Sequence, residues 1–114
     1  MHSSAFSLLA FLALADVALS ICPGFNYGVT TVQSLGDNNA WMVYDDSCTL
    51  VDMVIEPKNG NPCTSRTFGC SPPPVTINTY MNTQSKLVYA CRPAPGAGQC
   101  QGVDMAVCCR NDGH

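Results

Sequence analysis

The eight cysteines are the residues whose number and spacing most constrain the chemistry of this chain. They are separated by 25, 14, 6, 20, 8, 7 and 0 residues, so the last two, Cys108 and Cys109, are adjacent. A zinc site or a thioredoxin-type redox site needs closely spaced pairs such as CxxC, and the sequence has none. A bond between Cys108 and Cys109 themselves is disfavoured, because neighbouring Cα atoms lie about 3.8 Å apart and disulfides prefer about 4.4–6.8 Å. We therefore expect neither a metal nor a cofactor.

An even number of cysteines in a small chain instead predicts a structural framework of four disulfides. Its members are Cys22, Cys48, Cys63, Cys70, Cys91, Cys100, Cys108 and Cys109. Eight cysteines allow roughly a hundred pairings, and the sequence does not select one. If residues 103–109 form a strand, Cys108 and Cys109 point to opposite faces and must take different partners. Hydrophobins, which are fungal surfactant proteins, carry two cysteine doublets at other positions, so film formation is not expected here.

Residues for acid–base or nucleophilic catalysis are scarce. A nucleophile activated by histidine needs an imidazole beside it, and the two histidines are His2 and the terminal His114. A small ribonuclease would have only Glu56 and His114 to use. A glycosidase needs two carboxylates about 5–9.5 Å apart, and the candidates by residue type are Asp45, Asp46, Asp52, Glu56 and Asp104. Asp45 and Asp46 lie in a turn-like sequence. We expect no enzyme, and a small secreted hydrolase is the alternative.

Aromatic and proline residues offer a possible binding surface. An aromatic platform for sugar rings could include Trp41, Tyr27, Tyr44, Tyr80 and Tyr89, although core packing is the ordinary role of such residues. Pro93 and Pro95 lie in the stretch RPAPGAGQ, which a Cys91–Cys100 bond would close into a small ring. Without that bond, the stretch is presented between two anchored points. We take Trp41, Tyr27, Tyr44, Pro93 and Pro95 as the possible binding surface.

Composition and the first residues indicate a soluble secreted product. The first 20 residues contain an apolar run from Ala5 to Ala15 and end in small residues, as in a signal peptide cut after Ser20. The remaining 94 residues, 21–114, form one domain with seven acidic and five basic residues, a net charge of −2. No basic cluster indicates nucleic-acid binding, and no second long apolar run indicates a membrane anchor. We expect an extracellular monomer whose partner is a protein or a cell-wall glycan.

The elements that must position these residues are expected to be strands. Runs rich in Val, Ile, Thr and Tyr at 27–35, 40–45, 48–56, 74–81, 86–92 and 103–109 alternate with turns rich in Gly, Pro, Asn and Asp. Period-two alternation places Val103, Met105, Val107 and Cys109 on one side. Apolar spacing of three to four residues leaves a helix open at 27–35 or 48–55. We predict a mainly β, small disulfide-rich antiparallel sheet domain, with a small α+β fold as the alternative.

Several short motifs together resemble a group of small secreted cysteine-rich proteins of filamentous fungi, especially mushrooms and their relatives. These motifs are CPGFNYG, W-x-VYDDSC, GNPCT, FGCSPPP, YACRPxP and VCCRNDG, and they span nearly the whole region after residue 20. The resemblance implies secretion, a fungal source and an effector-like or toxin-like role outside the cell. Some fungal secreted proteins of this size are similar to killer-toxin α/β sandwiches, which defines the alternative fold. The resemblance supplies no active site.

Overall fold

The structure is a computed structural model that describes residues 21–71 and 76–111, so the expected signal peptide at 1–20 lies outside the described residues. Within the described ranges the chain forms nine β-strands and one short 3₁₀ turn. The strands are β1 (Tyr27–Thr30), β2 (Gln33–Leu35), β3 (Asn38–Asp45), β4 (Leu50–Pro57), β5 (Phe68–Cys70), β6 (Ile77–Met81), β7 (Val88–Pro93), β8 (Gln99–Cys100) and β9 (Val103–Arg110), and η1 spans Pro62–Thr64. The mainly β prediction is confirmed. The described residues contain no α-helix, including none long and apolar enough to cross a membrane.

The helix alternative at 48–55 is wrong because a bulge produces the helix-like spacing. Tyr44 pairs with Leu50 and Val43 with Asp52, so Val51 is an extra residue in β4. An extra residue shifts the strand alternation by one position. Leu50 and Met53 therefore face the same side although they are three residues apart. The other helix candidate, 27–35, contains β1 and β2.

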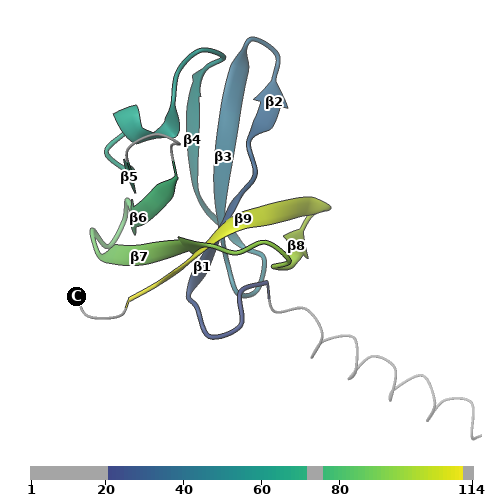
Figure 1. Cartoon of the computed structure of the whole chain (residues 1–114), viewed down its shortest axis with the longest axis vertical. Coiled ribbons are helices and arrows are strands. Elements are labelled where there is room, and N and C mark those ends of the chain that lie inside the picture. Colours follow the sequence, from purple (N-terminus) through teal and green to yellow (C-terminus); the bar gives the residue numbers. More distant parts are fainter. Residues whose placement is uncertain (1–20, 72–75, 112–114) are drawn as a thin grey trace, which may run out of the picture.

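All strand pairs are antiparallel, and β9 lies in the middle of the sheet. The strand order is β2-β3-β1-β9-β7-β6-β5, with β4 pairing β3 and β8 pairing β9. β4 follows the length of β3, so β1 and β2 share the other edge of β3 at different heights. Figure 1 shows β3 and β4 running at a steep angle to β9 and β7, with β1 near their crossing point. The sheet is therefore strongly curled rather than flat.

Three hydrogen bonds join the two ends of this curled sheet. The Asp52 carboxylate on β4 accepts hydrogen bonds from the Tyr80 hydroxyl on β6 and from the Thr83 hydroxyl and backbone N–H, the last at 3.2 Å. β4 and β6 are separated by β3, β1, β9 and β7 in the sheet order. The inner face encloses the main core, which comprises Val29, Val43, Val54, Phe68, Ile77, Tyr80, Tyr89, Cys91, Val107 and Cys109.

A second, smaller core covers the outer face of the sheet. It contains Ile21, Cys22, Tyr44, Cys100, Met105 and Cys108. Gly28, which pairs with Cys108, gives this core room, because a Cβ there would lie 2.8 Å from the Met105 Sδ and 3.0 Å from the Ile21 Cδ1. Simple alternation predicts that Met105 lies on the same side of the sheet as Val107 and Cys109. This prediction is wrong, because Met105 packs in the outer core and the other two pack in the inner core. Val29 pairs with Val107 and Thr30 with Met105, so a bulge at Ala106 reverses the alternation.

Four disulfides join all eight cysteines. The bonds are Cys22–Cys108, Cys48–Cys100, Cys63–Cys70 and Cys91–Cys109. The doublet takes two different partners: Cys108 packs in the outer core with Cys22, and Cys109 packs in the inner core with Cys91. The last strand is thereby tied to the first described residues on one face and to β7 on the other.

Candidate binding surface

Tyr44 is not available as a surface aromatic. Its side chain is 6 % exposed, packs in the outer core, and places its hydroxyl 3.9 Å from the Met42 Sδ. Tyr44 pairs with Leu50 just after the bulge in β4, on the side of the sheet that the Cys48–Cys100 bridge covers. Its place in the expected binding surface is therefore wrong.

The other three tyrosines pack against one another at the inner core. The Tyr27 ring meets Tyr80 and Tyr89 edge-on, with centroids 5.4 and 4.9 Å away. Tyr80 is fully buried and Tyr89 nearly so, whereas Tyr27 is half-buried. Burial, and then the hydrogen bond to the Asp52 carboxylate, raises the pKa of Tyr80 far above its usual value. Burial, and then the Tyr89 side chain, also raises the pKa of Tyr27. Tyr80 and Tyr89 are therefore core residues, which is the ordinary role of such rings, whereas the place of the half-buried Tyr27 in the possible binding surface stays a prediction.

Trp41 and Pro93 are brought together at one end of the curled sheet. Both line a hollow of about 380 Å³, which we call the mouth of the sheet. Among the described residues, its lining is Thr30, Thr31, Val32, Trp41, Pro62, Thr76, Ile77, Pro93, Ala106 and Val107. Trp41 is half-buried and Pro93 is exposed. Ile77 and Val107 belong to the inner core, so the mouth opens directly onto that core.

The mouth exists because β1 and β2 are not one continuous strand. β1 ends at Thr30, which pairs with Met105 just past the bulge at Ala106. The chain then leaves β9 at Thr31 and Val32 and pairs with the far half of β3 as β2. The Thr31 N–H still donates to the Asp104 carbonyl at 3.0 Å. The predicted strand at 27–35 is thus interrupted at its centre, where the hollow forms.

The loop from Pro93 to Gly98 is the second part of the predicted surface. The Ala94 N–H donates to the Ala106 carbonyl at 2.9 Å, and the Gly98 N–H donates to the Ile21 carbonyl at 2.9 Å. Gly96 has a φ of +87°, which favours glycine. Pro93 and Pro95 line a hollow of about 250 Å³ against Ile21 and other residues of the first described segment. Both prolines are exposed, so the structure leaves them accessible to a partner.

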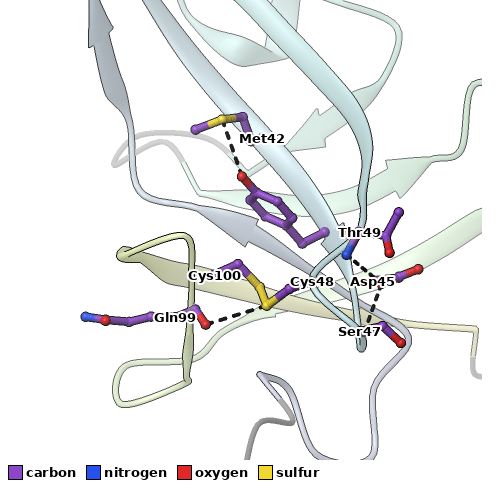
Figure 2. Close-up of a disulfide and its surroundings, with 8 residues drawn as sticks. Met42, Asp45, Ser47, Cys48, Thr49, Gln99 and Cys100 are labelled. Carbon is purple, nitrogen blue, oxygen red and sulfur yellow. Dashed lines mark hydrogen bonds between the residues drawn. A yellow bond between two sulfur atoms is a disulfide. The ribbon is translucent and has the colours of Figure 1, made fainter.

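Disulfides hold this loop at both ends but do not close it into a ring. Cys91 bonds to Cys109 and Cys100 bonds to Cys48, so the loop is presented between two anchored points. Figure 2 shows the Cys48–Cys100 bridge beside Gln99, whose carbonyl oxygen lies 3.7 Å from the Cys48 Sγ. Cys48 has a φ of 61°, a left-handed conformation that few non-glycine residues adopt. The bridge fixes the end of the loop to the β3–β4 turn.

Three of the carboxylates considered for catalysis, those of Asp45, Asp52 and Asp104, accept hydrogen bonds that stabilise the fold. The Asp45 Oδ1 accepts hydrogen bonds from the backbone N–H groups of Ser47 at 2.9 Å and Thr49 at 3.0 Å, as Figure 2 shows. Asp45 is therefore a turn former, as its sequence context predicts. Asp52 joins the ends of the sheet, and Asp104 accepts a hydrogen bond from the Gln99 side chain at 2.6 Å. Among residues 21–71 and 76–111, no three His, Cys, Asp or Glu residues lie close enough to hold a metal ion.

His114 and the segment 72–75, which includes three prolines of the SPPP motif, lie outside the described residues. Comparison with known proteins gives no match to any family model, curated protein or solved structure. The resemblance to fungal secreted proteins accordingly stays a prediction. Function must be argued from the mouth and the anchored loop.

Sequence reasoning missed most of the mouth. The residue types point only to Trp41 and Pro93, and the run 27–35 predicts one strand that includes Thr30, Thr31 and Val32. No local pattern marks these residues as lining a hollow, because the hollow depends on the bulge and the curl of the sheet. The Asp52–Tyr80 contact was missed too, although an aspartate inside the apolar run LVDMVIE is a signal for a paired carboxylate.

Proposed function

We propose that this chain is a secreted fungal protein that acts outside the cell by binding a partner, as an effector or toxin-like ligand. Four disulfides in a chain of 114 residues are typical of small extracellular proteins. The observation that carries the binding role is the loop from Pro93 to Gly98, which stands exposed between two disulfide-anchored cysteines. We propose an extracellular protein as the partner and no catalytic role.

The anchored loop is suited to binding because it is held in shape before contact. Two prolines fix backbone angles, and three backbone hydrogen bonds hold Ala94, Ala97 and Gly98. A loop that is rigid before binding loses less conformational entropy when it docks. Its residues from 93 to 98 carry no charge, so it suits a partner pocket that is apolar or neutral.

The binding test uses the secreted form with its four bridges intact, as shown by non-reducing mass spectrometry. Fluorescently labelled protein is titrated onto wall-bearing fungal and plant cells, with and without prior protease treatment of the cell surface. We expect saturable binding that protease treatment removes. Pro95→Asp, at the exposed tip of the loop, should weaken binding at least tenfold, whereas Leu87→Asp, at an equally exposed site, should not.

A cell-wall glycan is the second candidate partner, because Trp41 remains half-buried beside threonine side chains in the mouth. Half-exposed tryptophan side chains present an apolar face that can stack on a sugar ring. Binding on a glycan array that Trp41→Ala abolishes would favour this candidate over a protein partner. Turnover of glucan, chitin or RNA that is lost on substitution of Asp104 or Glu56 would instead favour a hydrolase and contradict the proposed binding role.

A further inference from the structure

The mouth of the curled sheet has the size of a small-molecule site. Its volume of about 380 Å³ lies within the range of about 300–1,000 Å³ that is usual for such sites. Ile77 and Val107, which belong to the inner core, line the hollow together with Trp41, Pro62 and Pro93. The mouths of β-barrels are among the preferred places for small-molecule sites, and here the Asp52 hydrogen bonds to Tyr80 and Thr83 bring β4 and β6 of the curled sheet together. The site shares Pro93 with the loop that carries the proposed function, but its described lining does not include Pro95 at the tip of that loop.

The chemistry of the lining selects against charge. None of the ten described residues that line the mouth carries a charged side chain, and seven of them are apolar: Val32, Trp41, Pro62, Ile77, Pro93, Ala106 and Val107. A charged group that enters such a site loses its hydration and finds no opposite charge in the lining. The occupant that fits is therefore uncharged and mainly apolar.

Three threonines supply the polar part of the lining. Thr30 is 1 % exposed, and its hydroxyl accepts a hydrogen bond from the Met42 N–H at 3.1 Å. The Thr31 hydroxyl accepts from the Gln33 side chain at 3.0 Å. Thr76, which precedes Ile77 in the chain, also lines the hollow. Thr31 is exposed and Thr76 is half-buried. A hydroxyl both donates and accepts, so these two groups can bind a single hydroxyl or carbonyl of an otherwise apolar molecule.

From this lining we infer that the mouth binds an uncharged, mainly apolar, ring-sized small molecule that carries one hydroxyl or carbonyl group. A sugar fits less well, because each of its several hydroxyls needs a partner and the described part of the lining has polar side chains only on its three threonines. Trp41, Pro62 and Pro93 pack against the apolar body, and a threonine hydroxyl orients the polar end. The site lies at the open end of the main core, so its occupant extends that core.

Trp41 makes occupancy directly measurable, because it is the only tryptophan of the chain and lies in the mouth. The secreted form with four intact bridges is titrated with 4-tert-butylcyclohexanol, with 4-tert-butylcyclohexanecarboxylate and with methyl β-glucoside, while tryptophan fluorescence is recorded. We expect saturable binding of the alcohol, binding at least tenfold weaker for the carboxylate, and none for the glucoside. Equal binding of alcohol and carboxylate, preference for the glucoside, or no saturable binding of the alcohol would overturn the inference. This comparison uses the unchanged chain.

A charge placed at the rim gives a second, independent measurement. Val32 lines the mouth and Leu87 does not, yet each is 51 % exposed, so an aspartate at either position is solvated and should not prevent folding. Val32→Asp should weaken binding of the alcohol at least fivefold, and Leu87→Asp should leave it unchanged. Val32→Lys should reduce the difference in affinity between the carboxylate and the alcohol, because the lysine supplies a positive charge for the carboxylate. Equal effects of the two aspartate variants would place the bound alcohol elsewhere and overturn the inference.

Discussion

At the scale of single residues, the cysteine doublet shows how far the alternation of side chains along a strand predicts disulfide partners. Cys108 and Cys109 are neighbours on β9, so their side chains enter opposite cores and bond to Cys22 and Cys91. Alternation predicts that they have different partners. It does not predict which ones, because the partners depend on the segments that lie beside β9.

Asp52 is the residue whose substitution should most affect closure of the curled sheet. Its carboxylate accepts hydrogen bonds from Tyr80 and from two groups of Thr83, and asparagine offers only one acceptor oxygen in its place. We expect Asp52→Asn to lower the free energy of unfolding by about 1–3 kcal/mol, the usual cost of an unpaired buried polar group. Urea denaturation followed by circular dichroism measures this change. Asp37→Asn, at an exposed turn residue, is the matched control and should change stability by less than about 0.5 kcal/mol.

Gln101 offers a stabilising substitution. Gln101 and Gly102 connect β8 to β9 and have φ values of 55° and 77°. A two-residue hairpin turn with positive φ at both positions favours Asn-Gly. Gln101→Asn should raise the free energy of unfolding by a few tenths to about 1 kcal/mol, and Gln101→Val should lower it, because β-branched residues resist this conformation. Thermal unfolding of both variants measures whether stability rises or falls. A change of the unfolding temperature in the same direction for both variants would contradict the turn geometry.

At the scale of elements, the sequence predicts the longer strands well and the short ones poorly. The runs 40–45, 48–56 and 103–109 correspond closely to β3, β4 and β9, because each has enough alternating residues to form an apolar face. β5 and β8 have three and two residues and were not predicted, since their pairing with β6 and β9 defines them more than their composition does. Bulges cause the remaining errors, because an extra residue reverses the side on which every following residue lies.

The four disulfides should differ in how much each contributes to the stability of the fold. Cys63–Cys70 joins η1 to β5 across a sequence separation of 7, whereas Cys22–Cys108 joins the first described segment to β9 across 86. Loop-closure entropy predicts contributions of about 2.5 and about 4.6 kcal/mol for loops of these lengths. Cys22 and Cys108 are also buried, and Cys63 and Cys70 are half-buried.

Replacing each cysteine pair by serine tests whether Cys22–Cys108 contributes more to stability than Cys63–Cys70. The Cys63→Ser, Cys70→Ser variant should remain folded with three bridges and a modest loss of thermal stability. The Cys22→Ser, Cys108→Ser variant should lose much more, because it also removes buried sulfurs from the outer core. Non-reducing mass spectrometry confirms the three remaining bonds in each variant. A larger loss from the 63–70 pair would show that the β5 edge matters more to the fold than the attachment of β9.

At the scale of the whole molecule, the curl of the sheet creates the candidate site. Trp41 and Pro93 could be selected from the sequence by residue type, but their meeting requires β3 and β7 to approach one end of the inner core. Of the tyrosines selected by the same criterion, Tyr80 and Tyr89 lie inside that core, Tyr27 packs against it, and Tyr44 lies in the outer core. Residue type predicts which side chains could bind, whereas long-range pairing determines which of them remain accessible.

The buried tyrosines predict that the whole fold becomes less stable at alkaline pH. Burial and the Asp52 carboxylate raise the pKa of Tyr80, so in the folded state it keeps its proton above pH 10. In the unfolded chain a tyrosine loses its proton near pH 10. Above that pH the unfolded state therefore binds fewer protons than the folded state, and its free energy falls relative to the folded state. The stabilisation is fully present below about pH 10 and decreases by about 1.4 kcal/mol per pH unit above it for Tyr80, with a further decrease from Tyr27, whose pKa is also raised.

Urea denaturation at neutral pH and at two values above pH 10, completed quickly enough to keep the disulfides intact, measures this dependence. Tyr80→Phe has no proton to lose at this position, so it should be less stable than the parent at neutral pH but lose less stability as the pH rises. Intact mass after return to neutral pH controls for disulfide damage. A parent protein whose stability does not change above pH 10 would contradict the burial of Tyr80 between the two ends of the sheet, and with it the closure that Asp52 makes across the inner core.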